Sequence, residues 1–222
     1  HGGVIFPETM FYFGLPNNND FGWGNPKREM TNRWIRWHYN NGLELTAMLL
    51  DTYAHTKDDG FLQSTLLPLA RPIVQFFREH ATKVNGKLHF DPAAALETRQ
   101  QAIDPAPDLA GLADVLPRLI ALPDSATTPA ERQEWAQMLA ELPPLPRGRT
   151  DGKGRIPESP ATASATGTPV LWPAYRFVKS QNVENPELYA VFPYRLFGVG
   201  MPELELAKAT FAAREFKDST CW

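Results

Sequence analysis

The chain has 222 residues, with 22 Lys and Arg against 25 Asp and Glu, and a single cysteine. A net charge of −3 gives no basic field for nucleic acid, and one cysteine excludes both an internal disulfide and a cysteine-based zinc site. Hydrophobic residues make up 43%, as in a folded domain, while no apolar run approaches the roughly 20 residues of a membrane span. We expect one domain, or a large piece of one, over residues 1–222.

Apolar residues at helical spacing predict most of the secondary structure. Residues 1–29, rich in Gly, Asn and aromatic side chains, are expected to form a structured loop. Helices are predicted over 30–55, 61–82, 108–122, 129–142, 187–197 and 202–216. A short strand is predicted at 87–90, a loop at 91–107, and a long loop or arm at about 143–170.

Glycine and proline mark special points in these helices. Gly42 predicts close packing or a bend in the first helix, and Pro68 with Pro72 predicts a kink or a restart in the second. Pro129 suits the first turn of a helix. Successive helices, low strand content and decorated loops favour a mainly α fold, an α/α toroid or a solenoid, in which each helix pair buries its apolar face against the next.

The sequence lacks the motifs of several classes of catalytic site. The sequence has no glycine-rich phosphate loop, no GxSxG and no HExxH-like pair of histidines. We therefore expect no cofactor and no metal site.

Glu97 is the candidate catalytic residue. It lies in Ala95-Leu96-Glu97-Thr98-Arg99, where apolar neighbours would raise the pKa of the carboxyl group and suit it to protonate a glycosidic oxygen. Two other interpretations are a salt bridge to Arg99 and a carboxylate at a helix end.

Other polar residues lie among aromatic ones, an association typical of sugar sites. Each also has a structural interpretation: a helix N-terminal carboxylate for Glu8, core packing for Trp37 and a satisfied structural histidine for His38. Asn185 with Glu187 can cap a helix that has Pro186 in its first turn. The candidate substrate-binding residues are Glu8, Trp37, His38, Asn41, Glu44, Arg99, Glu184, Asn185 and Glu187.

An ordered set of motifs resembles a known superfamily. The motifs are Asn41 to Leu45, Leu50 to Leu62, Asn85-Gly86-Lys87-Leu88, Ala95-Leu96-Glu97-Thr98, Asp104 to Asp108 and Glu184 to Pro193. They resemble the six-hairpin glycosidases, in particular glycoside hydrolase family 95 and a related uncharacterised bacterial glycosidase-like family. Family 95 has histidines where Glu184 and Glu187 stand here, which argues against a simple transfer of fucose specificity.

The resemblance implies an (α/α)6 barrel and an inverting hydrolysis with Glu97 as the general acid. The water-activating groups would then lie outside this chain. Together with the abrupt ends at His1 and Trp222, this predicts a fragment that forms an incomplete barrel and is inactive alone. We expect a bacterial carbohydrate-active hydrolase, exported to the periplasm or beyond, that acts on an oligo- or polysaccharide.

Two other functions stay open at this point. A polysaccharide lyase of the α/α toroid kind would need a Tyr/His or Arg pair placed for proton abstraction. A non-catalytic sugar-binding or scaffold protein would keep the aromatic residues without turnover.

Overall fold

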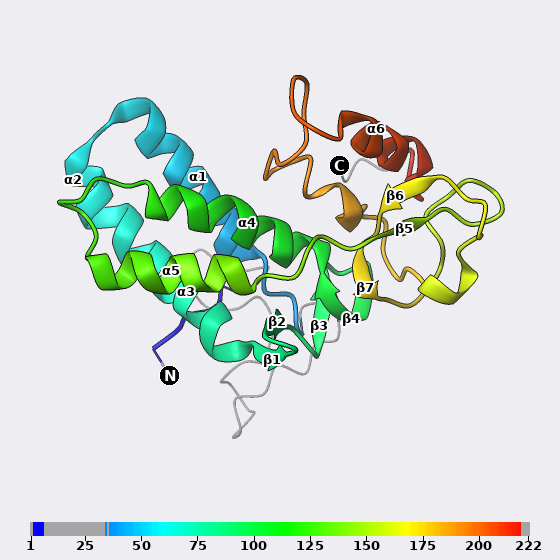
Figure 1. Cartoon of the computed structure of the whole chain (residues 1–222), viewed down its shortest axis with the longest axis horizontal. Coiled ribbons are helices and arrows are strands. Elements are labelled where there is room, and N and C mark those ends of the chain that lie inside the picture. Colours follow the sequence, from blue (N-terminus) through cyan, green and yellow to red (C-terminus); the bar gives the residue numbers. More distant parts are fainter. Residues whose placement is uncertain (1, 7–33, 35, 219–222) are drawn as a thin grey trace.

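The structure is a computed structural model and describes residues 2–6, 34 and 36–218 (Figure 1). Its α-helices are α1 (Asn41–Thr56), α2 (Asp59–Phe61), α3 (Leu67–His80), α4 (Ala106–Ile120), α5 (Pro129–Glu141) and α6 (Leu204–Ala213). A π-helical turn covers Leu62–Leu66, and 3-10 turns cover Pro160–Thr162 and Pro186–Leu188. The strands are β1 (Thr82–Val84), β2 (Lys87–His89), β3 (Ala93–Ala95), β4 (Arg99–Pro105), β5 (Arg147–Arg149), β6 (Pro169–Leu171) and β7 (Ala174–Arg176).

The expected mainly α toroid is wrong. Helices account for 43% and strands for 13%, so the fold is mixed α and β. The described strands form antiparallel sheets in the orders β1-β2, β3-β4-β7 and β5-β6. Helices α1 to α5 lie on one side of the molecule, and α6 lies with β5 and β6 on the other (Figure 1).

Two local predictions failed for identifiable reasons. The loop predicted over 91–107 is the β3–β4 hairpin, whose strand Ala93–Ala95 is fully buried and has too short an apolar run to show a period. The helix predicted over 187–197 is only a 3-10 turn at Pro186–Leu188. Pro193 lacks the N–H that a helix would need at that position.

Helices α4, α5 and α6 lie close to their predicted positions, whereas the predicted start of the first helix at residue 30 is wrong. Helix α5 begins with a capping box between Thr128 and Glu131, and Pro129 occupies its first turn as predicted. Helix α1 begins only at Asn41, after Trp37 with a left-handed φ of 70°. Pro68 lies in the first turn of α3, directly after the π-helical turn, where its missing N–H costs little.

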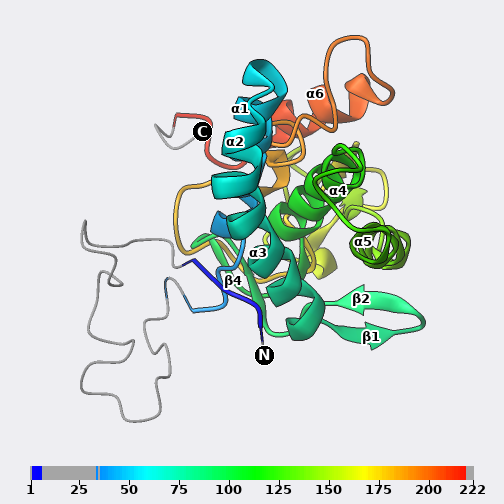
Figure 2. The ribbon, with the colours of Figure 1, turned by 90° about the vertical axis from the view of Figure 1, so that its left-hand side faces the viewer.

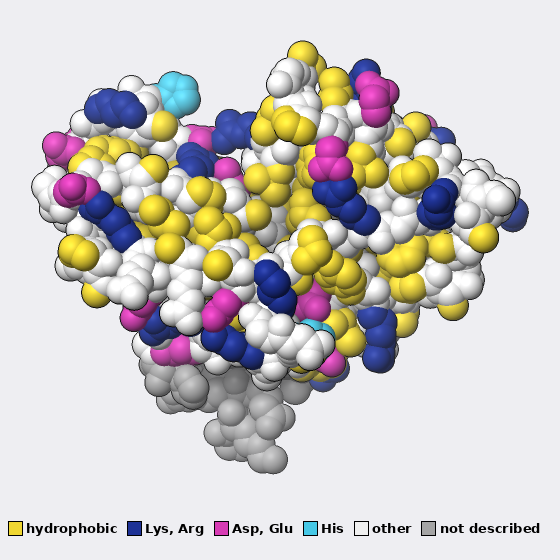
Figure 3. Space-filling view, viewed as in Figure 1, with side chains coloured by type: hydrophobic (Ala, Val, Ile, Leu, Met, Phe, Trp, Pro, Cys, Tyr) yellow, Lys and Arg dark blue, Asp and Glu magenta, His cyan; other side chains and the backbone are white. Residues whose placement is uncertain are grey.

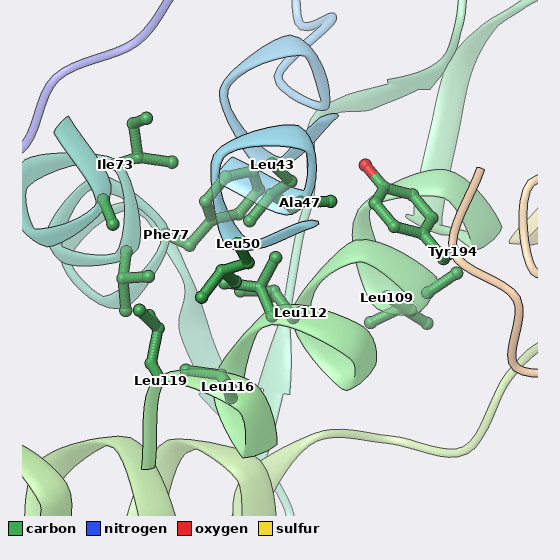
Figure 4. Packing of buried hydrophobic residues seen from close by; sticks show 14 of the residues in the cluster. Leu43, Ala47, Leu50, Ile73, Phe77, Leu109, Leu112, Leu116, Leu119 and Tyr194 are labelled. Atoms are coloured by element: carbon green, nitrogen blue, oxygen red, sulfur yellow. The ribbon is translucent and has the colours of Figure 1, made fainter. Parts of the chain in front are cut away.

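The main core lies between α1, α3 and α4 (Figure 4). Leu43, Phe77 and Leu112 are among its fully buried side chains, and truncating one such residue to alanine typically costs about 2–5 kcal/mol. The close packing predicted for Gly42 is confirmed. A Cβ atom there would lie 3.0 Å from Cγ2 of Ile73.

The β1–β2 hairpin projects beside this helical core (Figure 2). Strand β4 pairs with both β3 and β7, and it continues directly into α4 after Pro105. The three-stranded sheet thereby fixes the β3–β4 turn relative to α4. Most of the segment predicted as a long arm, 143–170, is irregular and includes β5 and a 3-10 turn.

The surface in Figure 3 mixes basic and acidic side chains without a large patch of one sign. Within the described parts of the chain, no helix combines the length and the apolar character that crossing a membrane requires.

Candidate functional site

The β3–β4 turn carries Glu97. Ala95 and Arg99 pair across the hairpin, which leaves a turn of three residues, 96–98. Leu96 has a left-handed φ of 57° and is 1% exposed. A leucine seldom adopts this conformation, and here burial of the side chain offsets its cost. Leu96 thus points inward, while Glu97 keeps partial access to solvent.

Glu184 lies against this turn although it is 86 residues from Thr98. The Thr98 hydroxyl donates to Oε2 of Glu184 at 2.9 Å, and Oγ1 accepts the Glu184 N–H at 3.0 Å. The Asn182 side-chain amide donates to Oε2 of Glu97 at 2.6 Å. Glu97 lies in this turn and Glu184 contacts it, although sequence analysis selected the two acids separately.

The environment of Glu184 favours its protonated form. Burial raises the pKa of Glu184 above its ordinary value, and the negative charge of Glu97 raises it further. Hydrogen bonds from the Thr98 side chain and from backbone amides of the turn oppose this shift. A raised pKa suits a carboxyl group to the role of proton donor.

Glu44 in α1 brings a third carboxyl group. Burial raises its pKa, hydrogen bonds from Tyr189 and Asn40 oppose the shift, and the charge of Glu184 adds to it. Nδ2 of Asn40 donates to Oε1 of Glu44 at 2.5 Å, and Oδ1 of Asn40 accepts the Tyr194 hydroxyl at 2.6 Å. Glu44 is thereby held by Tyr189 and by Asn40, which Tyr194 holds in turn.

Asp108, in the first turn of α4, is the fourth acid and was missed by sequence analysis. It is 0% exposed, and neither carboxyl oxygen has a hydrogen-bond partner among the described residues. Burial raises its pKa well above the ordinary value, and Glu44 raises it further. In the sequence it ends the Asp104 to Asp108 motif and begins a helix that also carries Asp114 and Arg118. We call Glu44, Glu97, Asp108 and Glu184 the carboxylate cluster.

Trp37 and His38 lie beside the hairpin. The Trp37 carbonyl accepts the Ala94 N–H at 2.9 Å, and its ring packs on the core under the guanidinium of Arg36, 4.0 Å from the ring centroid. His38 is 4% exposed, and burial lowers its pKa to about 4. Neither ring nitrogen has a partner among the described residues, so His38 is a neutral buried histidine.

Arg99 is turned toward the C-terminal segment. It is 2% exposed and donates to the Val178 carbonyl at 2.8 Å and to Oε2 of Glu215 at 2.9 Å. The salt bridge to Glu97 weighed from the sequence is thus replaced by one to Glu215. Arg99 therefore links strand β4 to the segments around Val178 and Glu215.

Asn185 and Glu187 belong to the same structural network as Arg99. The Asn185 side chain exchanges hydrogen bonds with the backbone of Phe216, at 3.0 and 3.1 Å, and does not cap the following turn. Glu187 is 2% exposed; burial raises its pKa to about 7, opposed by its own backbone N–H and by Arg99.

Asn41 makes only a weak contact, and Glu8 cannot be assigned to the cluster. Nδ2 of Asn41 contacts the Phe6 carbonyl at 3.5 Å, a long hydrogen bond. Glu8 lies outside the described residues. Within residues 2–6, 34 and 36–218, no three His, Cys, Asp or Glu side chains are placed to hold a metal ion.

Three cavities lined by described residues have volumes of 110, 450 and 110 Å³. The largest is lined by residues of β5, β6 and α6, including Arg147, Val170 and Leu206. None of these three adjoins the carboxylate cluster. The acids that line the 450 Å³ cavity are Glu203, which pairs with Arg147, and Glu205, which pairs with Lys208.

Comparison with known proteins adds no assignment. No protein-family model matches the sequence. A search of curated proteins also gives no match.

Proposed function

We propose that the protein is a carbohydrate-active hydrolase and that the carboxylate cluster performs its chemistry. The observation that carries the proposal is the pairing of Glu97 and Glu184 on one turn. Glycoside hydrolysis needs two acidic side chains of different character, one that gives a proton and one that is ionised.

The electrostatics favour Glu184 as the proton donor. In the proposed reaction its proton passes to the glycosidic oxygen as the bond from that oxygen to the anomeric carbon breaks. The carboxylate of Glu97 stabilises the positive charge that develops at the anomeric carbon. The oxygen of a water molecule bonds to this carbon, and the proton that the water releases reprotonates Glu184. The general-acid role predicted for Glu97 remains an alternative within the same pair.

Polar groups around the pair can bind sugar hydroxyls. The Asn182 amide and the Thr98 hydroxyl already contact the two acids. Tyr189 bonds to Glu44 on the adjacent element. These neutral donors and acceptors suit a hydroxyl-rich substrate.

The test is hydrolysis of a panel of aryl glycosides by the natural protein that contains these 222 residues, with Glu184→Gln and Glu97→Gln beside it. Sugar binding is measured in parallel by calorimetry. We expect turnover by the wild type, a loss of at least a hundredfold in each variant, and retained binding. Glu205→Gln, at an exposed position of α6, is the matched control.

Other outcomes separate the alternatives. Sugar binding without turnover would establish a non-catalytic binding protein. Release of unsaturated uronic-acid products, which absorb ultraviolet light, would establish a lyase. If both Gln variants turn over like the control, the pair is not catalytic.

A further inference from the structure

Two neighbouring residues of the β3–β4 hairpin fix the two ends of the segment 178–184, which we call the docked segment. At one end, Thr98 exchanges two hydrogen bonds with Glu184. At the other end, Arg99 donates to the Val178 carbonyl at 2.8 Å. The place of Glu184 beside the turn therefore depends on both hairpin residues.

Glu215, in the segment that follows α6, binds both sides of this contact. Its Oε2 accepts a hydrogen bond from Arg99 at 2.9 Å, and its Oε1 accepts one from the Ser180 hydroxyl at 2.8 Å. Arg99 belongs to β4 and Ser180 to the docked segment, so a single carboxylate joins the two. Sequence analysis did not select Glu215, which lies 116 positions beyond Arg99 in the chain.

The burial of Arg99 makes this carboxylate important. Arg99 is 2% exposed, and a buried cation is costly unless a well-placed anion accompanies it. The guanidinium is a rigid planar fork, in which one nitrogen donates to the Val178 carbonyl and another to Oε2 of Glu215. Removing Glu215 would therefore take away the ion pair that orients Arg99 toward the docked segment.

The backbone around Glu215 is itself anchored. The Asn185 side chain exchanges hydrogen bonds with the backbone N–H and carbonyl of Phe216, at 3.1 and 3.0 Å. The preceding helix, α6, is joined to β6 by a hydrogen bond from the Leu171 N–H to the Thr210 hydroxyl at 2.9 Å. These contacts fix the position from which the Glu215 carboxylate reaches its two partners.

We infer that Glu215 is a positioning residue for the Glu97–Glu184 pair. Its carboxylate binds Arg99 and Ser180 together and so holds the docked segment against the turn that carries Glu97. The consequence for catalysis rests on the proposed function, whereas the docking can be measured without turnover.

Amide hydrogen exchange on the 222-residue chain measures the docking. The reporters are Gln181 and Glu184, whose N–H groups donate to the carbonyl and the hydroxyl of Thr98. In Glu215→Ala, we expect both reporters to exchange about a hundredfold faster, because the ion pair and the bond to the docked segment are lost together. Amides of the β1–β2 hairpin, which open locally elsewhere in the fold, should keep their rates.

Ser180→Ala tests the same link from the docked segment. This variant keeps the ion pair between Arg99 and Glu215 and removes one hydroxyl, so it should fold. We expect the reporters to exchange about tenfold faster, as for the loss of one hydrogen bond to a charged group. Adding Ser180→Ala to Glu215→Ala should have little further effect, because the hydroxyl has then already lost its acceptor.

Glu203→Ala is the matched control, since Glu203 also pairs with an arginine, Arg147, and both side chains are nearly half exposed. It should leave the reporters unchanged. Wild-type reporter rates in folded Glu215→Ala or in Ser180→Ala would overturn the inference, as would an equal acceleration in the control. If Glu215→Ala does not fold, Ser180→Ala decides alone.

Turnover of aryl glycosides by the natural protein separates the inference from the proposed function. In an active protein we expect kcat to fall about tenfold in Ser180→Ala and further in Glu215→Ala, because the two acids lose their fixed spacing. Faster exchange with unchanged kcat would overturn the positioning role. Faster exchange in a protein whose wild type has no turnover would refute the proposed function and leave the docking role of Glu215 standing.

Discussion

Thr98 and Glu184 exchange two hydrogen bonds, hydroxyl to carboxylate at 2.9 Å and amide to hydroxyl at 3.0 Å. Thr98 is fully buried, and the backbone of Gln181 is also tied to it, through its N–H to the Thr98 carbonyl at 2.9 Å. One threonine thus docks the whole segment 181–184 onto the β3–β4 turn. The position of Glu184 beside Glu97 depends on this contact.

Thr98→Val should weaken that docking. Valine has the shape of threonine but no hydroxyl, so the variant leaves the Glu184 N–H without its acceptor and removes the side-chain donor to the Glu184 carboxylate. We expect a loss of about 1–3 kcal/mol in the free energy of unfolding, and a further rise in the pKa of Glu184. Urea denaturation and NMR titration measure the two effects. Thr98→Ser, which retains the hydroxyl, should stay near the wild type; equal losses in both variants would contradict a role for the hydrogen bonds.

Gly111→Ala tests the approach of Tyr194 to α4. The added Cβ atom would lie 2.8 Å from both Oη of Tyr194 and Cδ1 of Leu43, inside van der Waals contact. Since both neighbours are buried, we expect about 1–3 kcal/mol of destabilisation by overpacking. Gly152→Ala, with open space around its Cβ position, is the control and should be nearly neutral. A thermal melt that does not distinguish the two variants would count against the tight packing.

Glu187 should make stability depend on pH. Its pKa in the folded chain, about 7, lies above the ordinary value of 4.5. A raised pKa means that the contribution of Glu187 to the stability of the folded chain is fully present below pH 4.5 and is lost as pH rises through 7. Glu187→Gln removes this dependence, so relative to the wild type it should gain about 2–4 kcal/mol between pH 4.5 and pH 8. Denaturant titrations at several pH values check this, and a pH-independent difference between the two proteins would refute it.

His38 should make stability depend on pH in the opposite direction to Glu187. Its pKa falls from the ordinary 6.5 to about 4 on burial. A lowered pKa means that stability is present above pH 6.5 and is lost as pH falls toward 4, because the folded chain cannot readily charge the ring. Replacing His38 by Gln, of similar size and uncharged, should remove this acid sensitivity. A His38→Gln protein that loses stability toward pH 4 as steeply as the wild type would show that the histidine is not responsible.

Sequence periodicity located the long amphipathic helices well. The apolar spacing from Leu109 to Ile120 and the start of the next helix at Pro129 correspond to α4 and α5. These signals are local, because a helix makes its hydrogen bonds and its apolar face within one segment. The strands of the β3–β4–β7 sheet carried no such signal. Strand β3 is only three alanines long, and β7 pairs with β4 from far along the chain.

The sequence by itself determined which residue types could do acid–base chemistry and where the main helices run. The tertiary structure alone decided that Glu97 and Glu184 share a turn, that Arg99 belongs to the Glu215 network, and that Asp108 is buried without a partner. The physical reason is that the protonation state of an acid depends on burial and on neighbouring charges. For Glu97 and Glu184, both are set by the contact of Thr98 with a residue 86 positions along the chain, which no local pattern records.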